Sequence, residues 1–161
     1  MNIRNVIALA VSLALAFAAA SLGSLATAPN IDGWYATLHK PEWTPPNAAF
    51  PIVWTILYAM MAIAAWRIWI SDASARRIRT ALLIYAAHLA VNVAWSFAFF
   101  AMQSPRLGLA VIAVLVIMIV WTIAAFWRID RAAGLLLVPY MLWASFASAL
   151  NLAIVGLNSP V

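Results

Sequence analysis

The stretch 107–127 reads LGLAVIAVLVIMIVWTIAAFW and contains no Asp, Glu, Lys or Arg. A helix needs about 20 apolar residues to cross the hydrocarbon core of a bilayer, because each residue advances it by about 1.5 Å. The apolar residues here are continuous rather than alternating, unlike those of a membrane β-barrel strand. This stretch therefore predicts a transmembrane helix.

Four more uncharged stretches have the same character, at 6–28, 48–66, 81–103 and 133–157. With their flanks, the five stretches predict helices at about 4–28, 47–70, 79–103, 105–128 and 132–157. The predicted fold is an all-α membrane protein, a single domain over residues 1–161 built as a five-transmembrane-helix bundle.

The composition excludes several classes of protein. The chain is 68% hydrophobic and 8% charged, which no soluble domain of this length could bury. Its net charge of +5 lies in basic residues between the apolar stretches, so we expect lipid as the surroundings and no nucleic acid as a partner. The chain has no cysteine, and its two histidines lack metal-ligand spacing, so we expect no metal site.

Basic residues also predict the orientation. Arg4 and the arginines of the second and fourth connections lie on one side of the membrane, and the other side has only Lys40 and Arg106. By the positive-inside rule, the N-terminus is cytoplasmic. Inner and outer membranes are not distinguished.

The first stretch has two interpretations. Arg4, an apolar core and Ala26-Thr27-Ala28 resemble a cleavable signal peptide, but the apolar core is longer than the 7–15 residues typical of one. Whether residues 1–28 are retained stays open.

The first connection, about 29–47, is rich in proline and aromatic residues. Prolines fix φ and stiffen the backbone, and aromatic side chains give the segment apolar surface to bury. We therefore predict an ordered first loop that acts as a lid over one mouth of the bundle.

Three of the nine tryptophans, Trp54, Trp95 and Trp143, lie deep inside apolar stretches. A buried indole N–H needs a partner in protein or ligand. Three polar and aromatic helix faces accompany them: Trp54 with Tyr58; Tyr85, His88, Asn92, Trp95, Ser96 and Phe99; and Tyr140, Trp143, Ala147 and Asn151. These faces predict either a cavity for a flat, largely apolar ligand or polar contacts between helices, and the second interpretation is favoured for His88 and Ser96.

Four ordered blocks resemble the TspO/MBR family, which contains the tryptophan-rich sensory proteins and the mitochondrial translocator protein (the peripheral-type benzodiazepine receptor). They are WYATLHKPEWTPP at 34–46, WTILY at 54–58, Asn92-x-x-Trp95, and PYMLWASFASALN at 139–151. The resemblance implies a receptor, commonly a homodimer, that binds porphyrins such as protoporphyrin IX and benzodiazepine-site ligands, and regulates tetrapyrrole and stress responses. Porphyrin is then a ligand, and no cofactor is expected.

The resemblance also implies the site. Tyr35 and Pro46 belong to the lid edge; Trp54, Asn92, Trp95, Trp143 and Ala147 line the pocket, with Tyr58 and Phe146 nearby. Two alternative functions stay open: a porphyrin transporter, and an enzyme that degrades protoporphyrin with light and oxygen. In the enzyme, Trp54 and Trp143 would be the catalytic residues, through photo-oxidation. The C-terminal sterol-binding pattern of the mitochondrial members is absent, since no Lys or Arg follows Arg131.

Overall fold

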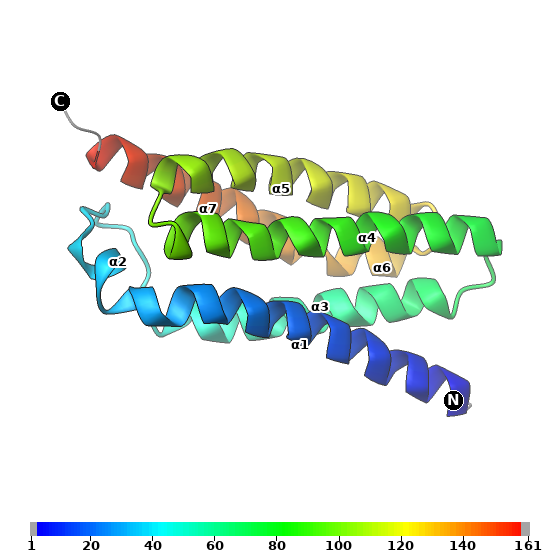
Figure 1. The fold of residues 1–161 in the computed structure, drawn as a ribbon. Coiled ribbons are helices and arrows are strands. Elements are labelled where there is room, and N and C mark those ends of the chain that lie inside the picture. Colours follow the sequence, from blue (N-terminus) through cyan, green and yellow to red (C-terminus); the bar gives the residue numbers. More distant parts are fainter. Residues whose placement is uncertain (1–2, 159–161) are drawn as a thin grey trace.

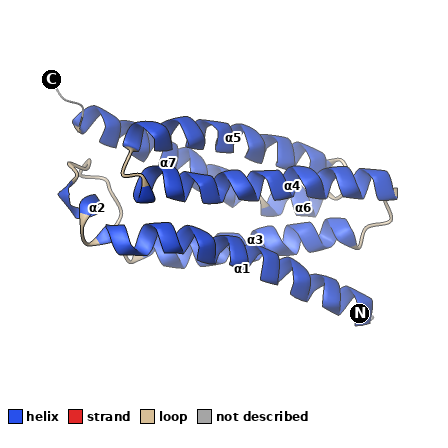
Figure 2. Ribbon diagram, viewed as in Figure 1, coloured by secondary structure: helices blue, strands red, loops and turns tan. Residues whose placement is uncertain are grey.

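The computed structural model describes residues 3–158, and all regular elements in that range are helices (Figures 1 and 2). The long helices are α1 (Ile3–Ile31), α3 (Ala49–Trp69), α4 (Ala75–Ser96), α5 (Pro105–Trp127) and α7 (Val138–Leu157). The short ones are α2 (Trp34–Thr37), the π-helix η1 (Phe97–Ala101) and α6 (Arg131–Leu136). With η1 continuing α4 and α6 preceding α7, the described chain has 5 helical segments long and apolar enough to cross a membrane. The predicted all-α, five-helix bundle is confirmed.

The two ends of the bundle differ. The start of α1, the α3–α4 connection and the α5–α6 connection lie at one end, and α2 and the end of α7 lie at the other (Figure 1). Within the bundle, α1 packs on α3, and α5 packs on both α4 and α7. At the first end, Arg67 Nε lies 2.7 Å from Asp130 Oδ2, and Asp130 also caps α6 by accepting from the Ala132 and Ala133 amides.

The last segment is broken into α6 and α7, where the sequence predicted one helix. The break falls at Leu137, two residues before Pro139. Proline has no amide hydrogen and its ring crowds the preceding turn, so it is disfavoured in the interior of a helix. Pro139 instead lies in the first turn of α7. Backbone amides in the first turn of a helix have no carbonyl partner within that helix, so a proline there costs no hydrogen bond.

Two other helix ends differ from the prediction. The helix α1 continues past Pro29 to Ile31, and its last turns are supported by Thr27 Oγ1 and Asn30 Nδ2, which donate to backbone carbonyls one turn earlier. The helix α4 begins at Ala75, so Arg76 and Arg77 lie in its first turn. Charged residues mark the end of an apolar stretch in the sequence. A helix can still continue through them, because arginine favours helix formation in water.

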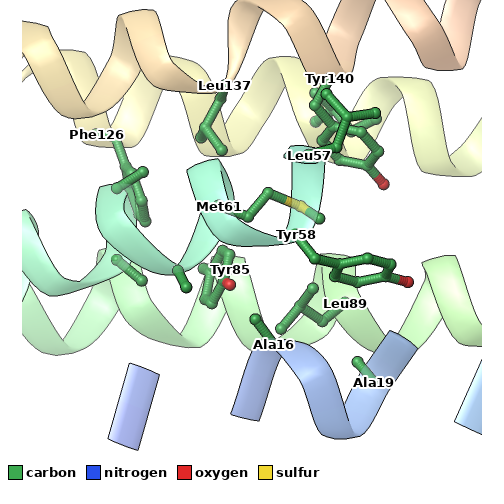
Figure 3. Packing of buried hydrophobic residues seen from close by; sticks show 14 of the residues in the cluster. Ala16, Ala19, Leu57, Tyr58, Met61, Tyr85, Leu89, Phe126, Leu137 and Tyr140 are labelled. Atoms are coloured by element: carbon green, nitrogen blue, oxygen red, sulfur yellow. The ribbon is translucent and has the colours of Figure 1, made fainter. Parts of the chain in front are cut away.

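The main buried cluster contains residues from all five long helices, α1, α3, α4, α5 and α7. Figure 3 shows Met61 of α3 among Leu57, Tyr58 and Tyr85. Met61 is fully buried, and so are Ala62 and Ala64 beside it. Small side chains let helix backbones approach closely, which is how helices gain packing contacts in a membrane.

Candidate functional site

A cavity of about 430 Å³ lies between α1, α3, α4 and α7, below the lid. This volume is within the range of small-molecule sites. No lining residue is acidic, basic or a histidine. The wall therefore offers apolar surface and a few hydrogen-bonding groups, and no acid–base pair. The lining residues are Phe17, Ala20, Gly23, Ser24, Thr27, Ala28, Ile31, Tyr35, Asn47, Phe50, Pro51, Trp54, Thr55, Tyr58, Asn92, Trp95, Ser96, Phe99, Phe100, Ala147, Leu150, Asn151 and Ile154.

The main polar feature of the wall is a chain of three side chains from three helices. The Tyr58 hydroxyl donates to Asn92 Oδ1 at 2.5 Å, and Asn92 Nδ2 donates to the Tyr140 hydroxyl at 2.7 Å. Asn92 is 2% exposed and Tyr140 is fully buried, so these bonds are shielded from water. The two phenols fix the Asn92 carboxamide, and within residues 3–158 its second N–H has no hydrogen-bond partner, so it can donate to a ligand.

Two Tyr→Phe substitutions test this chain of hydrogen bonds. Tyr140→Phe removes the acceptor for Asn92 Nδ2 and should destabilise the protein by about 0.6 kcal/mol, the average for hydrogen bonds between membrane helices, and by at most about 1.7 kcal/mol. Tyr85→Phe is the matched control, because the buried Tyr85 hydroxyl has no hydrogen-bond partner in the described structure. Its removal should leave stability unchanged or raise it. Reversible unfolding in mixed detergent micelles measures both, and equal losses would contradict the assignment.

The part of the cavity wall nearest the lid is built from aromatic rings. Tyr35 of α2 packs on Phe99 and Phe100, with ring centroids 6.2 and 5.6 Å away. The Met102 amide donates to the Phe97 carbonyl five residues earlier, the pattern of a π-turn, and both Phe99 and Phe100 are buried. Burial raises the pKa of the Tyr35 phenol above its ordinary value.

Lys40 holds the lid helix α2 in place. Its Nζ donates to the carbonyls of Tyr35 at 2.7 Å and Leu38 at 3.1 Å, and lies 4.7 Å from the centre of the Tyr35 ring. The Lys40 ammonium donates hydrogen bonds to carbonyls at the end of α2, a helix too short to be stable alone. The loop predicted as a lid is thus ordered over the cavity.

The structure brings together six of the nine predicted ligand-binding residues on the cavity wall: Tyr35, Trp54, Tyr58, Asn92, Trp95 and Ala147. Pro46, Trp143 and Phe146 are not in the lining. Trp143 packs edge-on against Phe50, a lining residue, at 5.7 Å, and against Phe146 at 5.4 Å. The structure thus places Trp143 beside the lining residue Phe50, and its contact with a ligand stays a prediction.

The two residues for which polar helix contacts were favoured behave differently. Ser96 lines the cavity, beside Gly23 of α1. His88 is fully buried outside the cavity, and its ring packs between Tyr85 and Tyr140 with centroids 5.3 and 5.4 Å away. No described side chain hydrogen-bonds its ring nitrogens. His88 therefore serves as an aromatic packing residue rather than a polar link.

The contribution of α1 was missed by sequence reasoning. Seven of its residues, from Phe17 to Ile31, line the cavity. A Cβ atom at Gly23 would lie 3.1 Å from Ser96 Oγ, so glycine permits the close approach of α1 to α4. The signal that could have found this face is the recurrence of Gly23, Ser24 and Thr27 in a helix otherwise rich in alanine and leucine.

Comparison of the amino-acid sequence with known protein families identifies the family of this chain. The model of the TspO/MBR family matches residues 10–157. The chain belongs to the TspO/MBR family. The resemblance seen in the four sequence blocks is confirmed, and the chain is an integral, multi-pass membrane protein.

TspO/MBR relatives from distant organisms support the assignment. The chain is 41% identical to the tryptophan-rich protein TspO of Chlorobaculum tepidum, over 96% of this chain and 98% of the relative. It is 42% identical to the tryptophan-rich sensory protein of Cereibacter sphaeroides, over 79% and 78%. It is 32% identical to the translocator protein of Sus scrofa, over 81% and 80%.

Proposed function

We propose that this TspO/MBR member is a membrane receptor that binds a flat, largely apolar tetrapyrrole such as protoporphyrin IX in the cavity below the lid. The observation that carries the proposal is the pairing of an aromatic wall, containing Trp54 and Trp95, with the shielded Asn92 carboxamide. Aromatic rings stack on a planar ligand, and one fixed amide provides orientation. The same cavity would admit benzodiazepine-site ligands of similar shape.

The proposal includes an orientation. Arg67, Arg76 and Arg77 lie at the same end of the bundle as the start of α1, opposite the lid. By the positive-inside rule, that end is cytoplasmic and the cavity mouth faces the other compartment. A ligand would then be sensed from outside the cytoplasm.

A titration in lipid nanodiscs tests the proposal. Protoporphyrin IX should quench the tryptophan fluorescence saturably, because Trp54 and Trp95 lie in the cavity wall. Asn92→Leu should weaken the affinity about 5- to 10-fold, the worth of one buried hydrogen bond. Empty nanodiscs of the same lipid correct for porphyrin dissolved in the bilayer. Quenching that never saturates, or that is identical in Asn92→Leu, would count against the site.

Illumination of the same samples in air separates the receptor from the photo-oxidative enzyme. Trp54 lines the cavity, so its indole can contact a bound porphyrin. Its ring centroid lies 5.7 Å from that of Tyr58, another lining residue. For a receptor alone, the porphyrin absorption should fade no faster with the protein than in empty nanodiscs. Faster fading that Trp54→Phe abolishes would instead establish the enzyme.

A further inference from the structure

The Asn158 carboxamide, directly after the end of α7, forms a clasp of two hydrogen bonds with the lid. The His39 amide donates to Asn158 Oδ1 at 3.0 Å, and Asn158 Nδ2 donates back to the His39 carbonyl at 2.8 Å. The two residues are 119 positions apart in sequence. One side chain therefore pairs with both backbone groups of one lid residue, as a neighbouring strand would.

The clasp lies beside the cavity wall. Asn158 follows Ile154, a lining residue, by one helical turn, and it also donates to the Ile154 carbonyl at 2.8 Å. On the lid side, Leu38 packs against the cluster that contains Tyr35 and Ile154. The clasped peptide thus connects the lid to the α7 wall where the two meet.

The clasp is suited to reversible opening. His39 is exposed and Asn158 is partly exposed, so water can replace either hydrogen bond. Each hydrogen bond that water can replace contributes little net free energy. Two such bonds favour the closed lid but still allow it to open. Local openings of this kind are typical of lids over binding sites.

We propose that Asn158 is the latch of the lid, and that it sets the rate at which ligand enters and leaves the cavity. The effect of Asn158 on ligand entry and exit rests on the proposed function, whereas its role in holding the lid closed does not. Asn158 acts by holding the His39 backbone rather than by touching the ligand. Its loss should speed both entry and exit and leave the affinity nearly unchanged, since the open lid is populated more in both the free and the bound protein.

The first test needs no ligand. In Asn158→Ala, hydrogen exchange of backbone amides in the peptide 34–44 should become about 5- to 10-fold faster, with the five membrane helices unchanged. Asn158→Asp keeps an acceptor for the His39 amide but loses the donor, and should be intermediate. His39→Ala is the matched control: it keeps both backbone groups and should exchange at the wild-type rate. Unchanged exchange in Asn158→Ala would overturn the latch.

The second test uses stopped-flow quenching with protoporphyrin IX. In Asn158→Ala, association and dissociation should both accelerate about 5- to 10-fold, with the dissociation constant changed less than about 2-fold. Faster dissociation alone would mean that Asn158 contacts the ligand, and unchanged rates would mean that the lid is not the entrance; either result overturns the gating role. If the wild type binds no porphyrin, the proposed function fails, and hydrogen exchange alone decides whether Asn158 is a latch.

Discussion

Ala147→Phe is expected to weaken protoporphyrin IX binding by at least about 30-fold, which corresponds to about 2 kcal/mol. Ala147 lies on the cavity face of α7 and is 8% exposed. A phenyl ring there would occupy space that the ligand needs. Because the ring fills a hollow instead of crowding a packed core, stability should be retained or increased. Binding lost without loss of stability is the expected signature.

Ala149→Phe is the matched control for this substitution. Ala149 lies two residues further along α7 on an exposed face, where a phenyl ring points into lipid. Porphyrin titration and unfolding in detergent should be carried out on both variants. If Ala147→Phe binds as tightly as Ala149→Phe, the ligand lies elsewhere, and the cavity below the lid is not the binding site.

Gly108→Ala is expected to destabilise the protein by about 1–3 kcal/mol, the usual cost of crowding a packed core. A Cβ atom at this position of α5 would lie 2.8 Å from Phe99 Cδ2 and 3.0 Å from Asn151 Oδ1. Phe99 is 3% exposed and Asn151 is 2% exposed, so neither can move aside freely. Both residues line the cavity, and porphyrin affinity should fall as well.

Gly156→Ala provides the comparison. A Cβ atom at Gly156 in α7 meets nothing within 4 Å, so no crowding arises. Because alanine favours helix more than glycine does, stability should stay the same or rise by up to about 1 kcal/mol. Equal effects of the two substitutions on the unfolding midpoint would show that the contact of Gly108 with Phe99 of η1 and Asn151 of α7 is not tightly packed.

Asn151 explains why this contact matters for the site. Its Nδ2 donates to the Pro105 carbonyl at the start of α5, and its Oδ1 accepts from the Trp95 indole at 3.4 Å. One amide thus connects α7, the start of α5 and an aromatic wall of the cavity. Crowding at Gly108 would disturb all three, and stability and binding are therefore coupled there.

Part of the site could be predicted from how far a residue lies from the ends of its apolar stretch. Trp54, Asn92 and Trp95 lie far from the ends of their apolar stretches, and a polar or indole group at that depth avoids lipid. All three line the cavity. Tyr140 was recognised as part of a polar face, but its role in fixing Asn92 was not, because a hydrogen bond across helices depends on how the helices cross.

Other parts of the site depend on how each helix is rotated about its axis and where it lies relative to its neighbours. Trp143 and Ala147 are one turn apart on α7, yet of the two only Ala147 is in the cavity lining, and Trp143 packs against Phe50 of α3. The face of α1 was missed because small residues carry a weak signal: they mark close approach, and close approach exists only once a second helix is placed.

The sequence by itself determined the membrane setting, the five spans and the ordered lid. Hydropathy and proline content are local properties, and water-free surroundings require backbone hydrogen bonds to be made within each helix. The tertiary structure alone decided the inward face of α1, the hydrogen bonds that fix Asn92 and the joining of His39 to Asn158. These depend on how helices of similar apolar character cross and rotate, and in lipid that is set by side-chain packing rather than by hydrophobicity.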